Sequence, residues 1–82
     1  MKKLLGVLVC NVFLFAMVDV NHASISELVS LNGIGKTKAK RIVNYREQNG
    51  CFKNINQLSG VKGISQKTIL KNKENIKIIS CQ

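Results

Sequence analysis

The sequence is poor in the residues that carry out catalysis. It has one histidine, His22, and four carboxylates that are scattered along 82 residues as Asp19, Glu27, Glu47 and Glu74. A single histidine allows no Ser-His-Asp or Cys-His arrangement beyond chance. No cluster of cysteine and histidine residues has the spacing that a zinc site requires. The sequence therefore predicts a protein that is not an enzyme and that holds no metal or other cofactor.

The shortage of acidic residues goes with a surplus of basic ones. Lysine and arginine number 13 against four acidic residues, which gives a formal net charge of +9. Without Lys2 and Lys3, 11 basic and 4 acidic residues remain, a balance of +7. An excess of this size favours an anionic partner, which can be nucleic acid, an acidic membrane surface or an acidic protein. The alternative interpretation is a lysine-rich surface that is merely solvated.

Residues 1–16 have the pattern of a secretory signal, with two lysines ahead of a short apolar run. A membrane span needs about 20 apolar residues, and this run is shorter and broken by Asn11. We expect cleavage after Ala16, which leaves an exported domain, residues 17–82, in the periplasm or outside the cell. The alternative is an uncleaved anchor in the inner membrane, because Leu14 stands where signal peptidase usually finds a small residue.

Export gives a meaning to Cys51 and Cys81, which lie in the predicted domain. Two cysteines in a small exported chain predict a disulfide. A bridge that closes a loop of this length contributes roughly 3.5 kcal/mol in the chain-entropy description, which is large for so small a core. The alternative is two free thiols in a reducing compartment.

An internal repeat of thirty residues organises the predicted domain. The offset aligns Ser24 with Asn54, Ile25 with Ile55, Glu27 with Gln57, Leu28 with Leu58, Gly33 with Gly63 and Ile34 with Ile64. In each copy an N-cap residue followed three positions later by Glu or Gln predicts a short helix with a capping box. A glycine turn ends that helix. A second helix follows, from Lys36 to about Asn49 in the first copy and from Gln66 to about Asn75 in the second.

Neither copy of the repeat can bury its apolar face alone. We therefore predict an all-α domain of four to five short helices, in which the hairpins 24–49 and 54–76 pack as a pseudo-twofold unit. Phe52, in the connection between the copies, is expected to fill the core between them. For residues 77–82 the sequence leaves open whether they end a helix or form an extended tail.

The two glycine turns, residues 31–35 and 61–65, favour binding of an anion. Each places a glycine that can adopt positive φ ahead of a helix start, where unpaired backbone N–H groups lie at the positive end of the helix dipole. Neither turn fits the P-loop pattern of mononucleotide sites, so a polymeric phosphate backbone is the better ligand. Ile34 and Ile64 are expected to anchor the turns in the core. The candidate binding residues are Gly33, Ile34, Gly35, Lys36 and Lys38 in the first copy and Lys62, Gly63, Ile64, Ser65 and Lys67 in the second.

The order of short motifs along the chain is more specific than either turn. The motifs are Val20-Asn21-His22-Ala23-Ser24, Leu31-Asn32-Gly33-Ile34-Gly35, Tyr45-Arg46, Asn49-Gly50, Phe52 and Val61-Lys62-Gly63-Ile64. This order resembles the tandem helix-hairpin-helix domain, (HhH)2, of ComEA-type competence proteins. The resemblance implies an exported, sequence-nonspecific binder of double-stranded DNA that captures incoming DNA in natural transformation. It also implies contact with components of a DNA-uptake pilus or an inner-membrane channel, and no small-molecule substrate.

Other functions of the same fold stay open at the level of the sequence. The runner-up is a helix-hairpin-helix module that binds a protein and no DNA, because Ser65 replaces the second glycine of the second turn. The intact first turn and the charge of +7 argue against that module. An intracellular repair protein is a third option, which the apolar N-terminal run disfavours. Tyr45 is the one aromatic residue in the predicted helices, so a stacking platform for single strands is not expected and duplex DNA is favoured.

Overall fold

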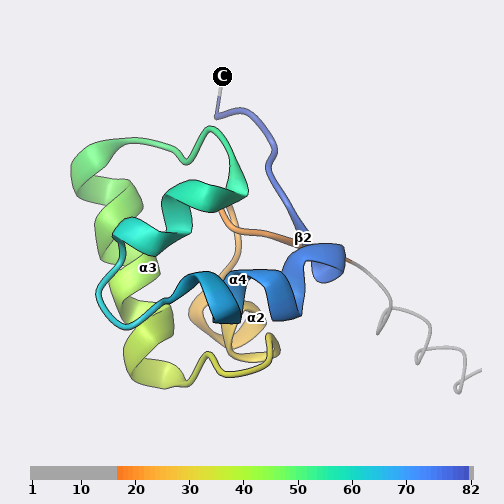
Figure 1. The fold of residues 1–82 in the computed structure, drawn as a ribbon. Coiled ribbons are helices and arrows are strands. Elements are labelled where there is room, and N and C mark those ends of the chain that lie inside the picture. Colours follow the sequence, from red (N-terminus) through yellow and green to blue (C-terminus); the bar gives the residue numbers. More distant parts are fainter. Residues whose placement is uncertain (1–16, 82) are drawn as a thin grey trace, which may run out of the picture.

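The computed structural model describes residues 17–81, and the predicted signal, residues 1–16, lies outside that range. In chain order the elements are β1 (Val18–Asp19), α2 (Ile25–Val29), α3 (Lys36–Asn49), the 3-10 helix η2 (Ile55–Gly60), α4 (Gln66–Asn72), the 3-10 helix η3 (Lys73–Asn75) and β2 (Ile76–Lys77) (Figure 1). The described range thus holds five short helical segments, which confirms the predicted all-α fold. Over that range, no helix combines the length and the apolar character that crossing a membrane demands.

The thirty-residue repeat of the sequence is also a repeat of the fold. Each position from 28 to 40 has the same burial, whether buried, intermediate or exposed, as the position thirty residues later. The buried positions of the first copy are Leu28, Leu31, Ile34 and Ala39, and those of the second are Leu58, Val61, Ile64 and Ile69. Helix α2 packs on α3, and η2 packs on α4. The two helical hairpins therefore share one plan, as the sequence predicts.

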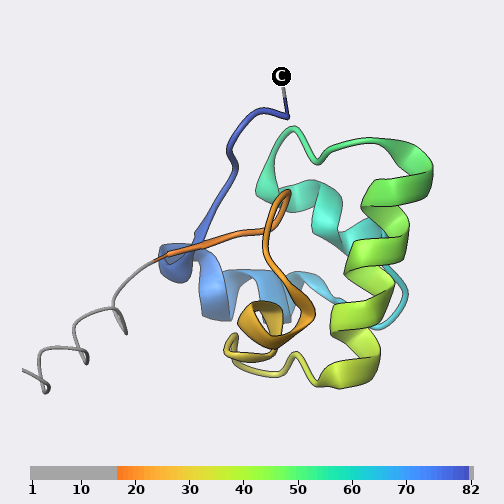
Figure 2. The same ribbon diagram turned by 180° about the vertical axis from the view of Figure 1, so that it is seen from behind.

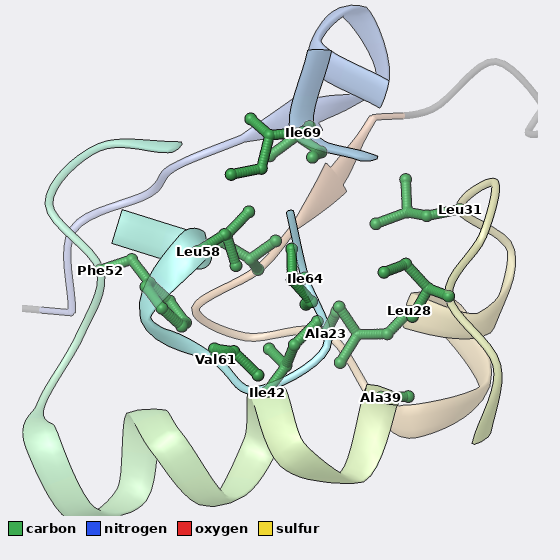
Figure 3. Close-up of a cluster of buried hydrophobic side chains, with 13 residues drawn as sticks. Ala23, Leu28, Leu31, Ala39, Ile42, Phe52, Leu58, Val61, Ile64 and Ile69 are labelled. Carbon is green, nitrogen blue, oxygen red and sulfur yellow. The ribbon is translucent and has the colours of Figure 1, made fainter. Parts of the chain in front are cut away.

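A single apolar core lies between the two repeats. Figure 3 shows side chains from both copies turned toward one another, with Ile42 of α3 beside Val61 of the second copy. Phe52 is 2% exposed and its ring stacks on Tyr45, with the ring centroids 5.1 Å apart and the planes 7° from parallel. The prediction that Phe52 fills the core between the copies is confirmed. Burial of apolar surface on this scale holds the two hairpins together.

The predicted capping boxes differ between the copies. The first is complete, because the Ser24 hydroxyl accepts the Glu27 N–H at 3.2 Å and the Glu27 carboxylate accepts the Ser24 N–H at 2.8 Å. In the second, Asn54 accepts the Gln57 N–H at 3.2 Å, but the Gln57 side chain accepts the N–H of Lys53 instead of that of Asn54. The prediction of a complete second box is therefore wrong. Here the segment is wound as the tighter 3-10 helix η2, which directs Gln57 to the residue before the cap.

The C-terminal residues form an extended segment. Helix α4 ends at Asn72, sooner than the predicted helix, and η3 follows before β2 pairs in parallel with β1. In that pair Val18 lies opposite Ile76 and Asp19 lies opposite Lys77. Both ribbon views show the orange segment that holds β1 passing beside β2, before the blue C-terminal tail runs away from it (Figures 1 and 2). Ile76 is 6% exposed, so its burial accounts for the return of the chain to the core.

Asn21 and a pair of cysteines tie the N-terminal segment, the connection between the repeats and the C-terminal tail together. The buried Asn21 side chain donates to the carbonyl oxygens of Phe52 and Ile79, at 3.0 Å each, and accepts the Phe52 N–H at 2.7 Å. The structure also brings Cys51 and Cys81 together, with their Cα atoms 6.3 Å apart, a separation that a disulfide can bridge. In the sequence these contacts lie outside the two glycine turns, residues 31–35 and 61–65.

Asp19 belongs to the same tied region and carries a shifted pKa. Its carboxylate accepts the N–H groups of Asn21 at 3.0 Å and Ile79 at 3.2 Å, and it also contacts the ring of His22. Burial by itself would raise the pKa of Asp19, but the hydrogen bonds from His22, Asn21 and Ile79 outweigh it and lower the pKa below 3.8. A carboxyl whose pKa is lowered by folding stabilises the folded state above its ordinary pKa. That stabilisation is lost as the pH falls through the folded-state pKa.

Asp19→Asn is expected to lower the free energy of unfolding at pH 7 by about 1 kcal/mol, since the ionised acceptor is lost while an amide oxygen remains. The difference between the two proteins should shrink as the pH falls through the lowered folded-state pKa of Asp19, because the wild-type carboxyl then becomes protonated. Urea unfolding at pH 7 and at low pH measures both values, with the exposed Glu47→Gln as the control for a lost negative charge. A difference that stays constant with pH would contradict the assignment to the Asp19 carboxylate.

Candidate nucleic-acid interface

Each glycine turn is a closed turn of four residues. In the first, the Ile34 N–H donates to the Leu31 carbonyl at 3.2 Å and Gly33 has φ of 80°. The second repeats this arrangement, with a distance of 3.0 Å from the Ile64 N–H to the Val61 carbonyl and φ of 94° at Gly63. Residues other than glycine rarely adopt such φ values. The glycine in the third position of each turn is therefore required by the backbone itself.

Ile34 and Ile64 anchor the turns and do not offer open amides. Both side chains are 5% exposed and belong to the core, as predicted. Although both residues are among the candidate binding residues, their backbone N–H groups are not free, because each closes its own turn by donating to the carbonyl of the residue three positions earlier. Among the described residues, the N–H groups of Gly33 and Gly35 in the first copy and of Gly63 and Ser65 in the second bond no acceptor. Further open donors lie at the start of the second helix of each copy.

The start of α3 presents three unpaired donors. Gly35 is the N-cap, with φ of −90° and ψ of −175°, and it has no side chain that could cap the helix. The first helical bond runs from the Ala39 N–H to the Gly35 carbonyl at 2.9 Å. The N–H groups of residues 36–38 donate to no acceptor within residues 17–81. A Cβ added to Gly35 would have no atom within 4 Å, so the space before these donors is open.

The start of α4 has the same backbone with one donor fewer. Ser65 has φ of −96° and ψ of 168°, close to the values of Gly35, so serine fits this position without changing the turn. Its hydroxyl accepts the Thr68 N–H at 3.3 Å. Within the described range the N–H groups of Gln66 and Lys67 remain without an acceptor. The replacement of glycine by Ser65 therefore preserves the shape of the second turn, but its hydroxyl bonds one of the N–H donors that a ligand could otherwise use.

Lys38 and Arg41 lie between the two turns. Lys38 donates through Nζ to the Gly33 carbonyl at 3.4 Å, and its Cε lies 3.3 Å from where a Cβ of Gly63 would be. Arg41 donates to the Lys62 carbonyl at 3.3 Å. Two side chains of α3 thus reach the turn of the other copy, and a larger residue at Gly63 would displace them. The sequence predicts Lys38 as a site residue but gives no sign that Arg41 contacts the second turn.

The remaining predicted lysines lie at the edges of the turns. Lys36 begins α3, Lys62 lies in the second turn and Lys67 lies in the first turn of α4, and all three are exposed. Together with Lys38 and Arg41 they add positive charge to the segments that carry the open donors. Backbone donors at a helix start and nearby cations together suit a phosphate group. Among the described residues no group of three or more His, Cys, Asp and Glu side chains is placed to hold a metal.

Comparison with known proteins places this arrangement in a family. Residues 15–77 match the family described as helix-hairpin-helix motif. The chain is 40% identical to ComE operon protein 1 of Bacillus subtilis over 63 residues, which cover 77% of this chain and 31% of that protein. It is 48% identical to an uncharacterized protein of Haemophilus influenzae over 59 residues, 71% of this chain and 53% of the relative.

A third relative shows the same segment in another setting. Kinesin-like protein KIF22 of Xenopus tropicalis is 48% identical over 50 residues, which are 61% of this chain and 8% of that protein. This chain therefore spans about half, or less, of the length of these relatives. The family match covers both glycine turns and the helices that carry them. The chain thus belongs to the helix-hairpin-helix family, as a ComEA-like member of it.

Proposed function

We propose that this protein binds double-stranded DNA without sequence preference, through the two glycine turns and the helix starts behind them. The observation that carries the proposal is the set of three unpaired N–H groups at residues 36–38, open to solvent behind Gly35 and beside Lys38. Such donors bind an anion through the backbone, so they need no particular side chain. The net charge of +9 supports an anionic polymer as the ligand.

In this mechanism the first turn holds a phosphate of one DNA strand and the second turn holds a phosphate of the other, across the minor groove. Lys36, Lys62 and Lys67 add charge-assisted contacts at the edges. Contacts to phosphate position a protein on DNA but carry no base information, so binding tolerates any sequence. Because the Ser65 hydroxyl already accepts one N–H of the second site, that of Thr68, the first turn contributes the larger share of the affinity for DNA.

The cellular role that we propose is capture of incoming DNA in natural transformation, as a binding protein and not as an enzyme. The proposal draws on the relative named ComE operon protein 1 and on the signal-like pattern of residues 1–16. After cleavage the domain would reside in the periplasm or outside the cell, where an oxidising environment would keep Cys51 and Cys81 bridged. An uncleaved N-terminus would instead hold the same domain at the inner membrane. Components of a DNA-uptake pilus or channel are the partners proposed for the bound complex.

Fluorescence anisotropy tests DNA binding directly. The purified protein is titrated against a labelled random-sequence duplex of 20 base pairs and against the matching single strand, at several salt concentrations. We expect micromolar binding of the duplex, weaker binding of the single strand, and a log–log salt slope near −3.6 if about four phosphates are neutralised. A second duplex of unrelated sequence is the control and should bind equally. Flat anisotropy with the duplex at low salt would contradict DNA binding and leave the protein-interaction module as the function to test.

A further inference from the structure

Asn72 is the most completely buried polar side chain of the described residues, at 1% exposure. It lies in α4 at the position that the thirty-residue offset aligns with Ile42, an apolar core residue of α3. A buried amide is costly unless its polar atoms are bonded. The Asn72 oxygen accepts the Asn32 N–H at 2.8 Å, and its nitrogen donates to the carbonyls of Asn32 at 2.8 Å and Thr68 at 2.9 Å.

Two of these three bonds hold a single residue of the first glycine turn. Asn32 immediately precedes Gly33, and both of its backbone polar groups are bonded to one side chain forty residues away in the sequence. Helix α4 also packs against this turn through Thr68, whose methyl group lies 3.8 Å from where a Cβ of Gly33 would be. The orientation of the first turn is therefore fixed by α4 of the second repeat, and not by its own repeat alone.

The second turn is held in the reciprocal way. Arg41 of α3 donates to the carbonyl of Lys62, the residue that the repeat aligns with Asn32. Each turn is thus held by the second helix of the other copy, through Asn72 in one direction and Arg41 in the other. A duplex presents phosphates at fixed separations, so a protein that grips two strands needs its two turns at a fixed spacing and direction.

We propose that Asn72 is a positioning residue for DNA binding, which holds the first turn and the open amides behind it in the direction that a phosphate requires, without touching DNA. This inference rests on the proposed function. It explains why the second copy departs from the apolar pattern of the first at this position. The polar residue at position 72 thus makes a specific contact between the two copies and is not a random loss of the repeat pattern.

The test compares the two buried asparagines. Asn72→Leu keeps the volume of the side chain and gives position 72 the apolar character of Ile42, but it leaves both backbone groups of Asn32 without their partner. We expect a folded protein whose duplex affinity falls about tenfold and whose salt slope becomes less negative by about 0.9, the value of one lost phosphate contact. The Asn32 amide should exchange its hydrogen faster. Asn21→Leu is the matched control, because Asn21 bonds Phe52 and Ile79 and not a turn.

A second variant guards against misfolding. The hydroxyl of Asn72→Ser can still bond the Thr68 carbonyl four residues earlier, but it is too short to replace the bonds to Asn32. Wild-type affinity and slope in a folded Asn72 variant would overturn the positioning role and leave the proposed function standing. An equal loss of affinity in folded Asn21→Leu would also overturn it, because the effect would then come from general loosening. Failure of the wild-type protein to bind the duplex would overturn the proposed function and the positioning role together.

Discussion

Gly35→Asp is expected to weaken duplex binding about thirtyfold to a hundredfold while the protein stays as stable as the wild type. Gly35 has φ of −90°, which any residue adopts, and a Cβ there meets no atom within 4 Å. Aspartate is a better N-cap than glycine, so its carboxylate would bond the open amides of α3 and stabilise the helix by a few tenths of a kcal/mol. The same carboxylate would occupy the donors that a phosphate needs and repel it, a loss of roughly 2–3 kcal/mol of binding free energy.

Anisotropy titration gives the dissociation constants, and urea unfolding followed by circular dichroism gives the stability. Ser24→Asp is the matched control, because it places the same charge at the N-cap of α2, where the capping residue already bonds Glu27. Gly35→Ser should fall between the wild type and Gly35→Asp, since it gives the first site the donor set of the second. If Gly35→Asp binds the duplex as tightly as the wild type, the start of α3 is not where a phosphate binds.

The parts of the fold that the sequence predicts correctly are those that depend on local signals. Gly33 and Gly63 mark the turns because only glycine takes their φ values easily, and the thirty-residue offset marks the pairs of helices. Periodic apolar residues such as Leu28 and Leu58 identify the buried face of each short helix. Each turn glycine and each apolar pattern acts within a few residues, and the offset repeats these local signals in the second copy, so the sequence itself displays them.

The features that the sequence does not predict depend on contacts between distant residues. In the sequence Asn72 only interrupts an apolar pattern with a polar residue. Its role is not visible there, because its hydrogen-bond partner Asn32 lies forty residues away. Arg41 reads as one more basic residue on a helix, although its guanidinium bonds the second turn. The pairing of β1 with β2 involves two residues on each strand and leaves no periodic trace. In the candidate site the repeat therefore predicts the backbone donors, and the tertiary structure supplies the side chains that orient them.

Replacing Cys51 and Cys81 with serine is expected to cause the largest loss of stability of any change described for this protein. The two cysteines are 30 residues apart, and removing a bridge that closes such a loop costs roughly 3–4 kcal/mol in the chain-entropy description. A domain of this size has a total stability of only about 5 kcal/mol, so about 1–2 kcal/mol would remain and roughly a tenth of the molecules should be unfolded at 37 °C. The bridge joins the connection before Phe52 to the tail that pairs with β1, so its loss frees the C-terminus first.

Urea unfolding with and without dithiothreitol separates the effect of the disulfide on stability from the effect of the serine substitutions. Cys10, the third cysteine of the sequence, is changed to serine in all proteins so that it cannot form mixed disulfides. The reductant should lower the midpoint of the cysteine-containing protein and leave that of the double serine variant unchanged. The glycine turns lie far from both cysteines in the sequence and take their support from Asn72 and Arg41. The fraction that remains folded at low temperature should therefore bind the duplex with wild-type affinity. Equal midpoints in all four conditions would mean that the tail is held by Asn21 and the paired strands, and that the bridge contributes no stability.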